Sequence, residues 1–368
     1  MKELLKKNII NLRGQSLKKK LVVIESDDWG SIRIPSQKVA KDLISKGLLN
    51  EQDPFDTVDS LETEQDLQGL LDVLNSHKDH VDNSPVLTAN MVMANPDFEA
   101  IKESGFSSYT YEVFTETYKR NPTTANSFKV LQQGVQERLI APQFHAREHL
   151  NSILWMQYLQ NQREDFHVAF DQGCFSIKDS SPTNRRKNIM ATYDYYSTAE
   201  LKTIQESIKE GVALFEAVFH VKSETTIAPC YVWDSKIEKT FNDLGIDTFQ
   251  GSKYQNMPLK NTNKFTRKLR YMGQKERDNT YLIRNCLFEP AINNKIDWVD
   301  ACMESIRVAF FWKKPAIIGS HRINFSGGIN PKNRETNLRL LDSLLSKIVA
   351  TWPDVEFISS AKLTKYYQ

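Results

Sequence analysis

Short apolar runs rich in valine and isoleucine alternate along this chain with longer amphipathic stretches. That alternation indicates an α/β fold, in which parallel strands are joined and covered by helices. Several runs are apolar without strict alternation, which is typical of strands that are covered on both faces. The predicted strands are Lys20–Ser26, Pro85–Met91, Leu139–Phe144, Thr225–Cys230, Ile246–Gln250, Tyr281–Phe288, Ala316–Ser320 and Val355–Ser359.

The segments between these runs carry apolar residues three or four positions apart, as helices that cover a sheet do. The predicted helices are Thr63–Asn75, Asp97–Ser104, Ser197–Val218, Ile237–Leu244 and Glu335–Ala350. Because no repeat or low-complexity linker interrupts the pattern, we expect one domain over residues 1–368, with insertions near 35–62 and 160–197. The polar, turn-rich stretch CFSIKDSSPTNRRKN in the second insertion predicts a loop over one end of the fold.

Charge and apolar patterning exclude several functions. The 48 basic and 46 acidic residues leave no global field that would recruit nucleic acid. No apolar run approaches the roughly 18 residues that membrane insertion needs, and the basic N-terminus lacks the apolar core of an export signal. We therefore expect a cytoplasmic protein. The four cysteines lie far apart without a CxxC pair, so we expect free thiols, and the sequence leaves the oligomeric state open.

Two adjacent carboxylates, Asp27 and Asp28, come directly after the first predicted strand. This is the end at which parallel α/β folds assemble their sites. Two neighbouring carboxylates repel, so burying both in the ionised form requires a cation or strong donors nearby. The alternative interpretation is a plain strand-to-loop connection with exposed acids.

His145 and His149 form an HxxxH pattern after another predicted strand. On a helix, residues four apart share a face, so both imidazoles could reach one metal ion. His321 likewise ends an apolar strand, and a histidine has the right character for proton transfer near neutral pH. Three strand ends thus offer metal-ligating or acid–base groups, although each pattern alone also fits an ordinary surface or strand-end residue.

Taken together, these motifs resemble the polysaccharide deacetylase superfamily, whose fold is a distorted (β/α)7 barrel. The Asp-Asp pair looks like the first family motif, HxxxH like the second, and Ala228-Pro229-Cys230-Tyr231 like the third. His321 matches the last catalytic motif, and VEFISSAKL looks like the terminal strand and turn. The motifs occur in the family order over nearly the whole chain, so the resemblance implies a distorted barrel of parallel strands with outer helices and inserted loops.

The resemblance also implies roles for these residues. Asp28, His145 and His149 would hold one divalent metal ion, Zn²⁺ by ligand preference with Co²⁺, Mn²⁺ or Ni²⁺ as alternatives. Asp27 would act as the general base and His321 as the general acid. The implied reaction is removal of N- or O-linked acetyl groups from a carbohydrate or a polysaccharide precursor, so an acetylated carbohydrate is the expected partner.

Substrate contacts are predicted from neighbouring residues. Trp29, Tyr231 and Trp233 could stack on sugar faces, with core packing as the alternative, and a backbone N–H near Tyr231 is expected to help hold the oxyanion. Arg147 and Arg322 are the predicted basic contacts.

The sequence departs from the family pattern in four ways. Ala228 stands where the third motif usually has an arginine that orients the base, with Arg147, Arg322 or Arg33 as candidate substitutes. The aspartate that supports the acid histidine has no clear counterpart, and Asp247 and Glu289 are the candidates. Trp29 intervenes where a glycine usually follows Asp-Asp, and the gap between the first two motifs is long.

Three other interpretations stay open. The segment His145–His149 also matches HxxEH, a metallopeptidase signature in which Glu148 would be the base, but that motif needs a helix. A barrel of this kind could instead hydrolyse glycosides with Asp27 or Glu289. It could also be a catalytically silent glycan-binding protein.

Overall fold

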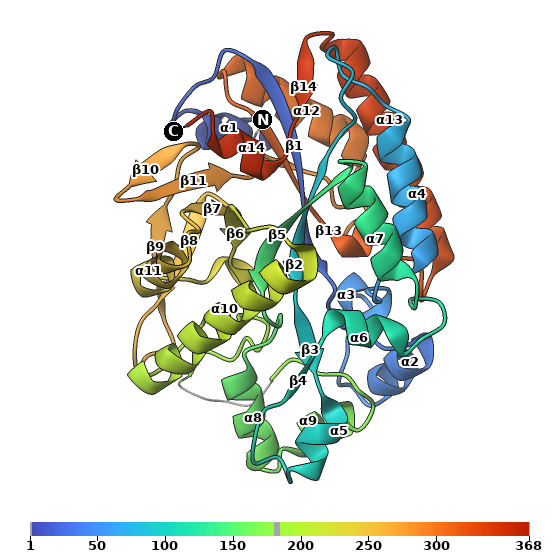
Figure 1. Ribbon diagram of the computed structural model, residues 1–368, viewed down its shortest axis with the longest axis vertical. Coiled ribbons are helices and arrows are strands. Elements are labelled where there is room, and N and C mark those ends of the chain that lie inside the picture. The colour runs from blue at the N-terminus through green and yellow to red at the C-terminus, as the bar shows by residue number, and fades with distance from the viewer. Residues whose placement is uncertain (1, 180–184, 368) are drawn as a thin grey trace.

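The computed structural model describes residues 2–179 and 185–367 and confirms an α/β fold with a large, mostly parallel sheet surrounded by helices (Figure 1). The strands of this sheet are β1 (Lys20–Trp29), β2 (Leu87–Val92), β5 (Ile140–Ala146), β6 (Thr225–Ile227), β7 (Thr248–Gly251), β10 (Gln274–Glu276), β11 (Asn279–Ile283), β12 (Cys286–Leu287), β13 (Ala316–His321) and β14 (Val355–Phe357).

Among the described residues these strands run in the order β10-β11-β7-β6-β5-β2-β1-β13-β12, with β14 paired to β1. Every neighbouring pair is parallel except β10 with β11. All of the predicted strands are present. The strand predicted over Thr225–Cys230 ends earlier, at Ile227, because Pro229 cannot donate to a ladder and Cys230 and Tyr231 have positive φ angles.

The ends of the sheet meet through a broken strand. β11 pairs with β7 and β12 pairs with β13, yet only Arg284 and Asn285 separate β11 from β12 in the chain. The two edges of the sheet therefore approach each other, and the sheet has a barrel-like form. The prediction of one continuous strand over Tyr281–Phe288 was therefore wrong. Asn285 replaces ladder bonds at the break, since it accepts from the Ile317 N–H at 2.8 Å and donates to the Pro315 carbonyl at 2.9 Å.

Helices cover the outside of this sheet (Figure 1). They are α1 (Lys2–Asn11), α2 (Gln37–Ser45), α3 (Pro54–Thr57), α4 (Glu64–Asn75), α5 (Phe98–Glu103), α6 (Phe114–Lys119), α7 (Ser127–Gln136), α8 (Ser152–Gln160), α9 (Glu164–Phe170), α10 (Thr198–Phe219), α11 (Ser235–Asp243), α12 (Trp298–Phe311), α13 (Pro331–Thr351) and α14 (Ser360–Thr364). The five predicted helices correspond to α4, α5, α10, α11 and α13. The others, including the buried α12, were not predicted.

Smaller elements complete the fold. Two antiparallel strand pairs lie outside the main sheet, β3 (Ala94–Pro96) with β4 (Tyr111–Val113) and β8 (Tyr254–Pro258) with β9 (Phe265–Leu269). Short 3₁₀ turns follow two of the strands, at Pro229–Tyr231 and Arg322–Asn324. No helix among residues 2–179 and 185–367 has the length and apolar character needed to cross a lipid bilayer.

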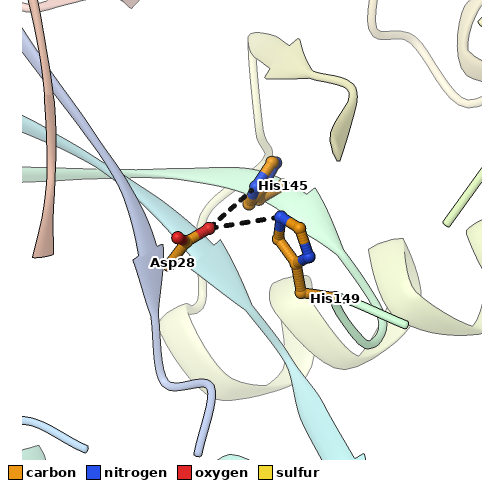
Figure 2. A group of neighbouring side chains, drawn as sticks. All are labelled: Asp28, His145 and His149. Carbon is orange, nitrogen blue, oxygen red and sulfur yellow. Dashed lines mark ion pairs between the residues drawn. The ribbon is translucent and has the colours of Figure 1, made fainter. Parts of the chain in front are cut away.

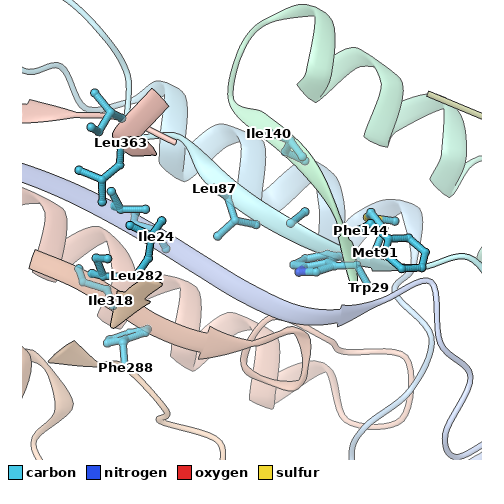
Figure 3. Packing of buried hydrophobic residues seen from close by; sticks show 14 of the residues in the cluster. Ile24, Trp29, Leu87, Met91, Ile140, Phe144, Leu282, Phe288, Ile318 and Leu363 are labelled. Carbon is cyan, nitrogen blue, oxygen red and sulfur yellow. The ribbon is translucent and has the colours of Figure 1, made fainter. Parts of the chain in front are cut away.

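The main core fills the space between the strands and the covering helices. Ile24, Leu87, Ile140, Leu282 and Ile318 come from five different strands and are fully or almost fully buried (Figure 3). Nine of the ten residues of β1 are buried, which agrees with the near-continuous apolar run expected for a strand covered on both faces.

A second, smaller core joins the two predicted insertions. Ala40 and Leu43 from the first insertion belong to one cluster with Phe170 and Phe175 from the second and with Trp155 of α8. The insertions therefore support each other at the end of the fold where β1 and β5 finish. Residues 180–184 of the turn-rich stretch lie outside the described residues, and the residues on either side of them line the cavity described next.

Candidate active site

A cavity of about 530 Å³ opens at the carboxyl ends of the strands. Its floor includes Asp27, Asp28, His145, His149 and His321, which are the predicted catalytic and metal-ligating residues. Three separate segments, far apart in the sequence, deliver these side chains to one place. The carboxyl ends of neighbouring parallel strands lie on the same edge of a sheet, which explains this convergence.

The adjacent aspartates diverge because the backbone turns between them. Asp27 remains in the ladder opposite His321, whereas Asp28 has a φ of +74°. Aspartate tolerates this left-handed conformation better than most residues, and such strain persists only where the surrounding structure holds it. Gly30, with a φ of +86°, donates its N–H to Glu62 at 2.8 Å, and a side chain there would meet the Val92 carbonyl at 2.6 Å.

Asp27 lies in a buried network that neutralises its charge. Arg284 donates to both of its carboxylate oxygens at 2.6 Å, and Asn90 donates to Oδ1 at 2.7 Å. The third arm of the guanidinium donates to Glu25 at 2.7 Å. Burial acts to raise the pKa of Asp27, but the Arg284 guanidinium outweighs it and the pKa falls to about 2. Asp27 is therefore ionised at neutral pH.

Arg284 is the arginine that pairs with Asp27. Arg147, Arg322 and Arg33 were the predicted candidates for an arginine that orients this carboxylate, and that prediction was wrong. Arg284 lies at the break between β11 and β12, and its side chain passes over Gly319, where an added Cβ would meet Arg284 Cδ at 2.7 Å. Sequence reasoning missed it. Two local signals were available: an arginine inside the apolar run YLIRNCLF, and a strand glycine, which often marks close approach of another group.

Asp28, His145 and His149 converge into a second cluster (Figure 2). Asp28 Oδ1 lies 3.4 Å from His145 Nε2 and 3.3 Å from His149 Nε2. His145 donates its Nδ1–H to the Ile227 carbonyl at 2.7 Å, so Nε2 presents its lone pair to the cluster. Burial lowers the pKa of His149 to about 4, although the Asp28 carboxylate acts to raise it. The His149 ring is therefore neutral at neutral pH.

These residues fit a divalent cation. One carboxylate oxygen and two imidazole nitrogens, all within 4.8 Å of one another, are the ligand types that zinc and similar ions prefer. Asp28 Oδ1 and His145 Nε2 are buried and have no hydrogen-bond partner among the described residues. Buried polar atoms without partners are costly, and a cation would satisfy both.

His321 stands on the opposite side of Asp27, at the end of β13. Its Nε2 lies 3.8 Å from Asp27 Oδ2, and its Nδ1 is bonded to Glu289 Oε1 at 2.7 Å. Burial would lower the pKa of His321, but the carboxylate of Glu289 outweighs that effect and raises it to about 10. Asp247 and Glu289 were the predicted candidates for the carboxylate that supports His321. Glu289 makes this contact, whereas Asp247 is exposed.

Tyr231 is the one predicted substrate contact that lines the cavity. Its backbone N–H donates to the Ala228 carbonyl at 2.9 Å, so the expected oxyanion contact cannot come from this N–H as it stands.

The two tryptophans predicted to stack on sugars are core residues instead. Trp29 is fully buried, donates to Ser26 Oγ at 3.0 Å and stacks on Phe325. Trp233 is 1% exposed and stacks on Phe249. Neither lines the cavity, because each ring turns into the apolar interior beside its strand end.

The two predicted basic contacts are also corrected by their positions. Arg322 is fully buried, where it donates to Asp59 at 2.7 Å and to Glu62 at 3.1 Å and so ties the first insertion to the end of β13. Arg147 donates to Glu148 at 2.6 and 2.7 Å and lies over the Tyr111 ring at 4.4 Å. Both arginines lie outside the cavity lining and hold the loops around it.

The geometry also disfavours two of the alternatives. His145 belongs to β5 and His149 to the loop after it, so HxxEH does not lie on a helix, and Glu148 is buried against Arg147. Glycoside hydrolysis is disfavoured because neither proposed carboxylate is free to act on a sugar. Asp27 is paired with Arg284. Glu289 is bonded to His321 and to Asn324, both at 2.7 Å, and does not line the cavity.

Fold and site define an α/β protein of barrel-like form with a buried carboxylate–imidazole cluster at the strand ends. No protein-family model matches the chain, and no curated protein matches it. Several solved structures do. A 4-alpha-glucanotransferase from Thermococcus litoralis is 6% identical with a TM-score of 0.45, and the match covers 95% of this chain but only 40% of that one.

Two further structures cover more of their own chains. A protein named as a polysaccharide deacetylase, from Mycobacterium smegmatis, is 10% identical with a TM-score of 0.41, over 96% of this chain and 92% of that one. A protein named as a glycoside hydrolase/deacetylase, from Parabacteroides distasonis, is 8% identical with a TM-score of 0.49, over 96% and 73%.

Proposed function

We propose that this protein is a metal-dependent hydrolase that removes N- or O-linked acetyl groups from a carbohydrate or a polysaccharide precursor. The observation that carries the proposal is the buried cluster of Asp28, His145 and His149, which faces the same cavity as Asp27 and His321. A cation site, a separate carboxylate and a separate imidazole are the parts that metal-assisted acyl hydrolysis requires. The cytoplasmic location remains a prediction from the sequence.

Asp28, His145 and His149 would hold one divalent cation, with Zn²⁺ favoured and Co²⁺, Mn²⁺ or Ni²⁺ as alternatives. When bound, such a cation polarises a carbonyl group and makes an adjacent water more acidic.

The remaining chemistry belongs to the chain's own groups. Asp27 is ionised and held in place by the Arg284 fork, so it can accept the proton of the attacking water without changing its position. His321 is kept protonated by Glu289 and presents Nε2 beside Asp27, so it can donate a proton to the departing amine or alcohol. Asp27 is buried, whereas the His321 side chain is 27% exposed and lines the cavity, where a leaving group can reach it.

A pair of matched variants tests this assignment. Asparagine tolerates the left-handed backbone at Asp28, so Asp28→Asn should fold but lose stoichiometric zinc, measured by elemental analysis, together with acetate release. Asp27→Asn should retain zinc and lose turnover by roughly 10²–10⁴-fold, as the removal of a general base does. Asp247→Asn, at an exposed aspartate, is the control and should change neither quantity.

The assay is acetate release from a panel of N- and O-acetylated sugars and oligosaccharides by zinc-loaded protein. Full activity of Asp28→Asn would contradict the assignment. Wild-type protein that binds acetylated glycans without metal, and equally well after Asp27→Asn, would instead identify a silent glycan-binding barrel.

A further inference from the structure

The wall of the cavity carries positive charge that the protein itself does not neutralise. Arg33, Lys178 and Lys187 all line it. Lys178 forms an ion pair with Asp53 at 2.8 Å, so its charge is already balanced. Arg33 and Lys187 form no ion pair with any described carboxylate, and the sequence of the undescribed segment 180–184, SSPTN, contains no acidic residue. Two cationic side chains therefore remain for a ligand.

Arg33 is held beside the proposed acid without being paired. Its guanidinium lies over the Phe55 ring at 4.6 Å, and that ring meets the His321 imidazole edge-on at 5.7 Å. Arg33 Nε is buried and has no hydrogen-bond partner among the described residues. Asp56 forms no ion pair with Arg33, and burial raises the pKa of that carboxyl although the Arg33 charge acts to lower it. Stacking thus fixes the position of Arg33 but leaves its charge unbalanced.

Lys187 lies on a segment that is anchored on both sides. The preceding Arg186 is buried and donates to Asp194 at 2.8 and 2.9 Å and to the Leu259 carbonyl at 2.8 Å. The following Asn188 donates to Cys230 Sγ at 3.4 Å, at the cavity wall. The backbone at Lys187 is therefore fixed at the mouth of the cavity.

Acidic side chains of the wall do not offset these two cations. Asp179 also lines the cavity, but it accepts from Tyr158 at 2.7 Å and from Arg163 at 3.1 Å. Asp27 is balanced by Arg284 and Glu289 by His321, and Asp28 is the carboxylate of the proposed cation site. A neutral sugar would leave Arg33 and Lys187 unsatisfied, whereas an anionic group would pair with them.

We propose that the substrate is an acidic sugar whose carboxylate or phosphate binds Arg33 and Lys187 while its acetyl group faces Asp27 and His321. This inference rests on the proposed deacetylase function and specifies its substrate class. The planar guanidinium fork matches both carboxylate and phosphate oxygens, so the two groups are variants of one anionic ligand chemistry.

Binding to three matched probes tests the inference: N-acetylglucosamine, its 6-phosphate and its uronic acid. With zinc-loaded protein, calorimetry should show at least one acidic probe binding about tenfold or more tightly than the neutral sugar, with an advantage that shrinks as salt rises. Arg33→Met and Lys187→Met should each remove most of that advantage, while Lys178→Met, a cavity lysine already paired with Asp53, should retain it. The acidic probe that is preferred identifies the anionic group.

Equal binding of neutral and acidic probes, or an unchanged preference after Arg33→Met, would overturn the inference. The same preparations assayed for acetate release separate it from the proposed function. An Arg33-dependent preference without acetate release from any acetylated sugar leaves the acidic site standing and rejects deacetylation. Acetate release without a preference for acidic sugars supports deacetylation and rejects the acidic-sugar site.

Discussion

Asp27 and Asp28 are neighbours in the chain, but their carboxylates lie in opposite surroundings. Asp27 is paired on both oxygens by Arg284 and receives a further bond from Asn90. Asp28 faces two imidazoles, and its Oδ1 has no hydrogen-bond partner among the described residues (Figure 2). The first environment is complete within the protein, whereas the second would be completed by the proposed cation.

This difference separates two physical tasks. An arginine fixes the position and the ionised state of Asp27, so that carboxylate is available for proton transfer. The cluster around Asp28 instead keeps neutral imidazole and carboxylate lone pairs directed at one point. If both aspartates were paired with arginine, the site would have a base but no place for a metal ion.

The largest effect is expected when the Arg284 environment is broken. Arg284→Met leaves the buried carboxylates of Asp27 and Glu25 without their cation, so the free energy of unfolding should fall by about 3–5 kcal/mol. Denaturation in urea measures this loss. Arg284→Lys retains a charge without the fork and should lose less, while a loss below about 1 kcal/mol in Arg284→Met would show that the network is not the main support of Asp27.

A smaller effect is expected when the Asp28 environment is filled. Zinc at a hundredfold excess over its dissociation constant should raise the free energy of unfolding by about 2.7 kcal/mol. Thermal or chemical denaturation with and without zinc, after removal of metal by a chelator, measures the difference. His149→Gln should abolish this stabilisation, whereas Asp27→Asn should keep it. Equal stabilisation of the His149 variant would place the metal elsewhere.

The smallest effect concerns the acid beside Asp27. Glu289 raises the pKa of His321, and a general acid acts only while protonated, so activity should fall as the pH rises through that pKa. Glu289→Gln removes the carboxylate and lets the pKa of His321 fall toward the ordinary value of about 6.5. The basic limb of a plot of log kcat/KM against pH should therefore move to lower pH. An unmoved basic limb would contradict the role of Glu289.

The sequence alone determined the α/β class, the positions of the strands and the residues at their ends. Asp27, Asp28, His145 and His321 were recognisable because they end or closely follow apolar runs, and His149 because of its HxxxH spacing from His145. The resemblance to the deacetylase pattern narrowed the supporting carboxylate of His321 to two candidates, Asp247 and Glu289.

Only the tertiary structure decided what those residues touch. Arg284 reaches Asp27 because β11 and β12 break where the sheet meets itself and Gly319 leaves room for the side chain, and neither fact is visible within one strand. Trp29 and Trp233 resembled sugar platforms but face the core, since the direction of a side chain depends on which neighbouring strand covers it. Local pattern sets which residues stand at a strand end, whereas pairing register and packing between distant segments set their partners.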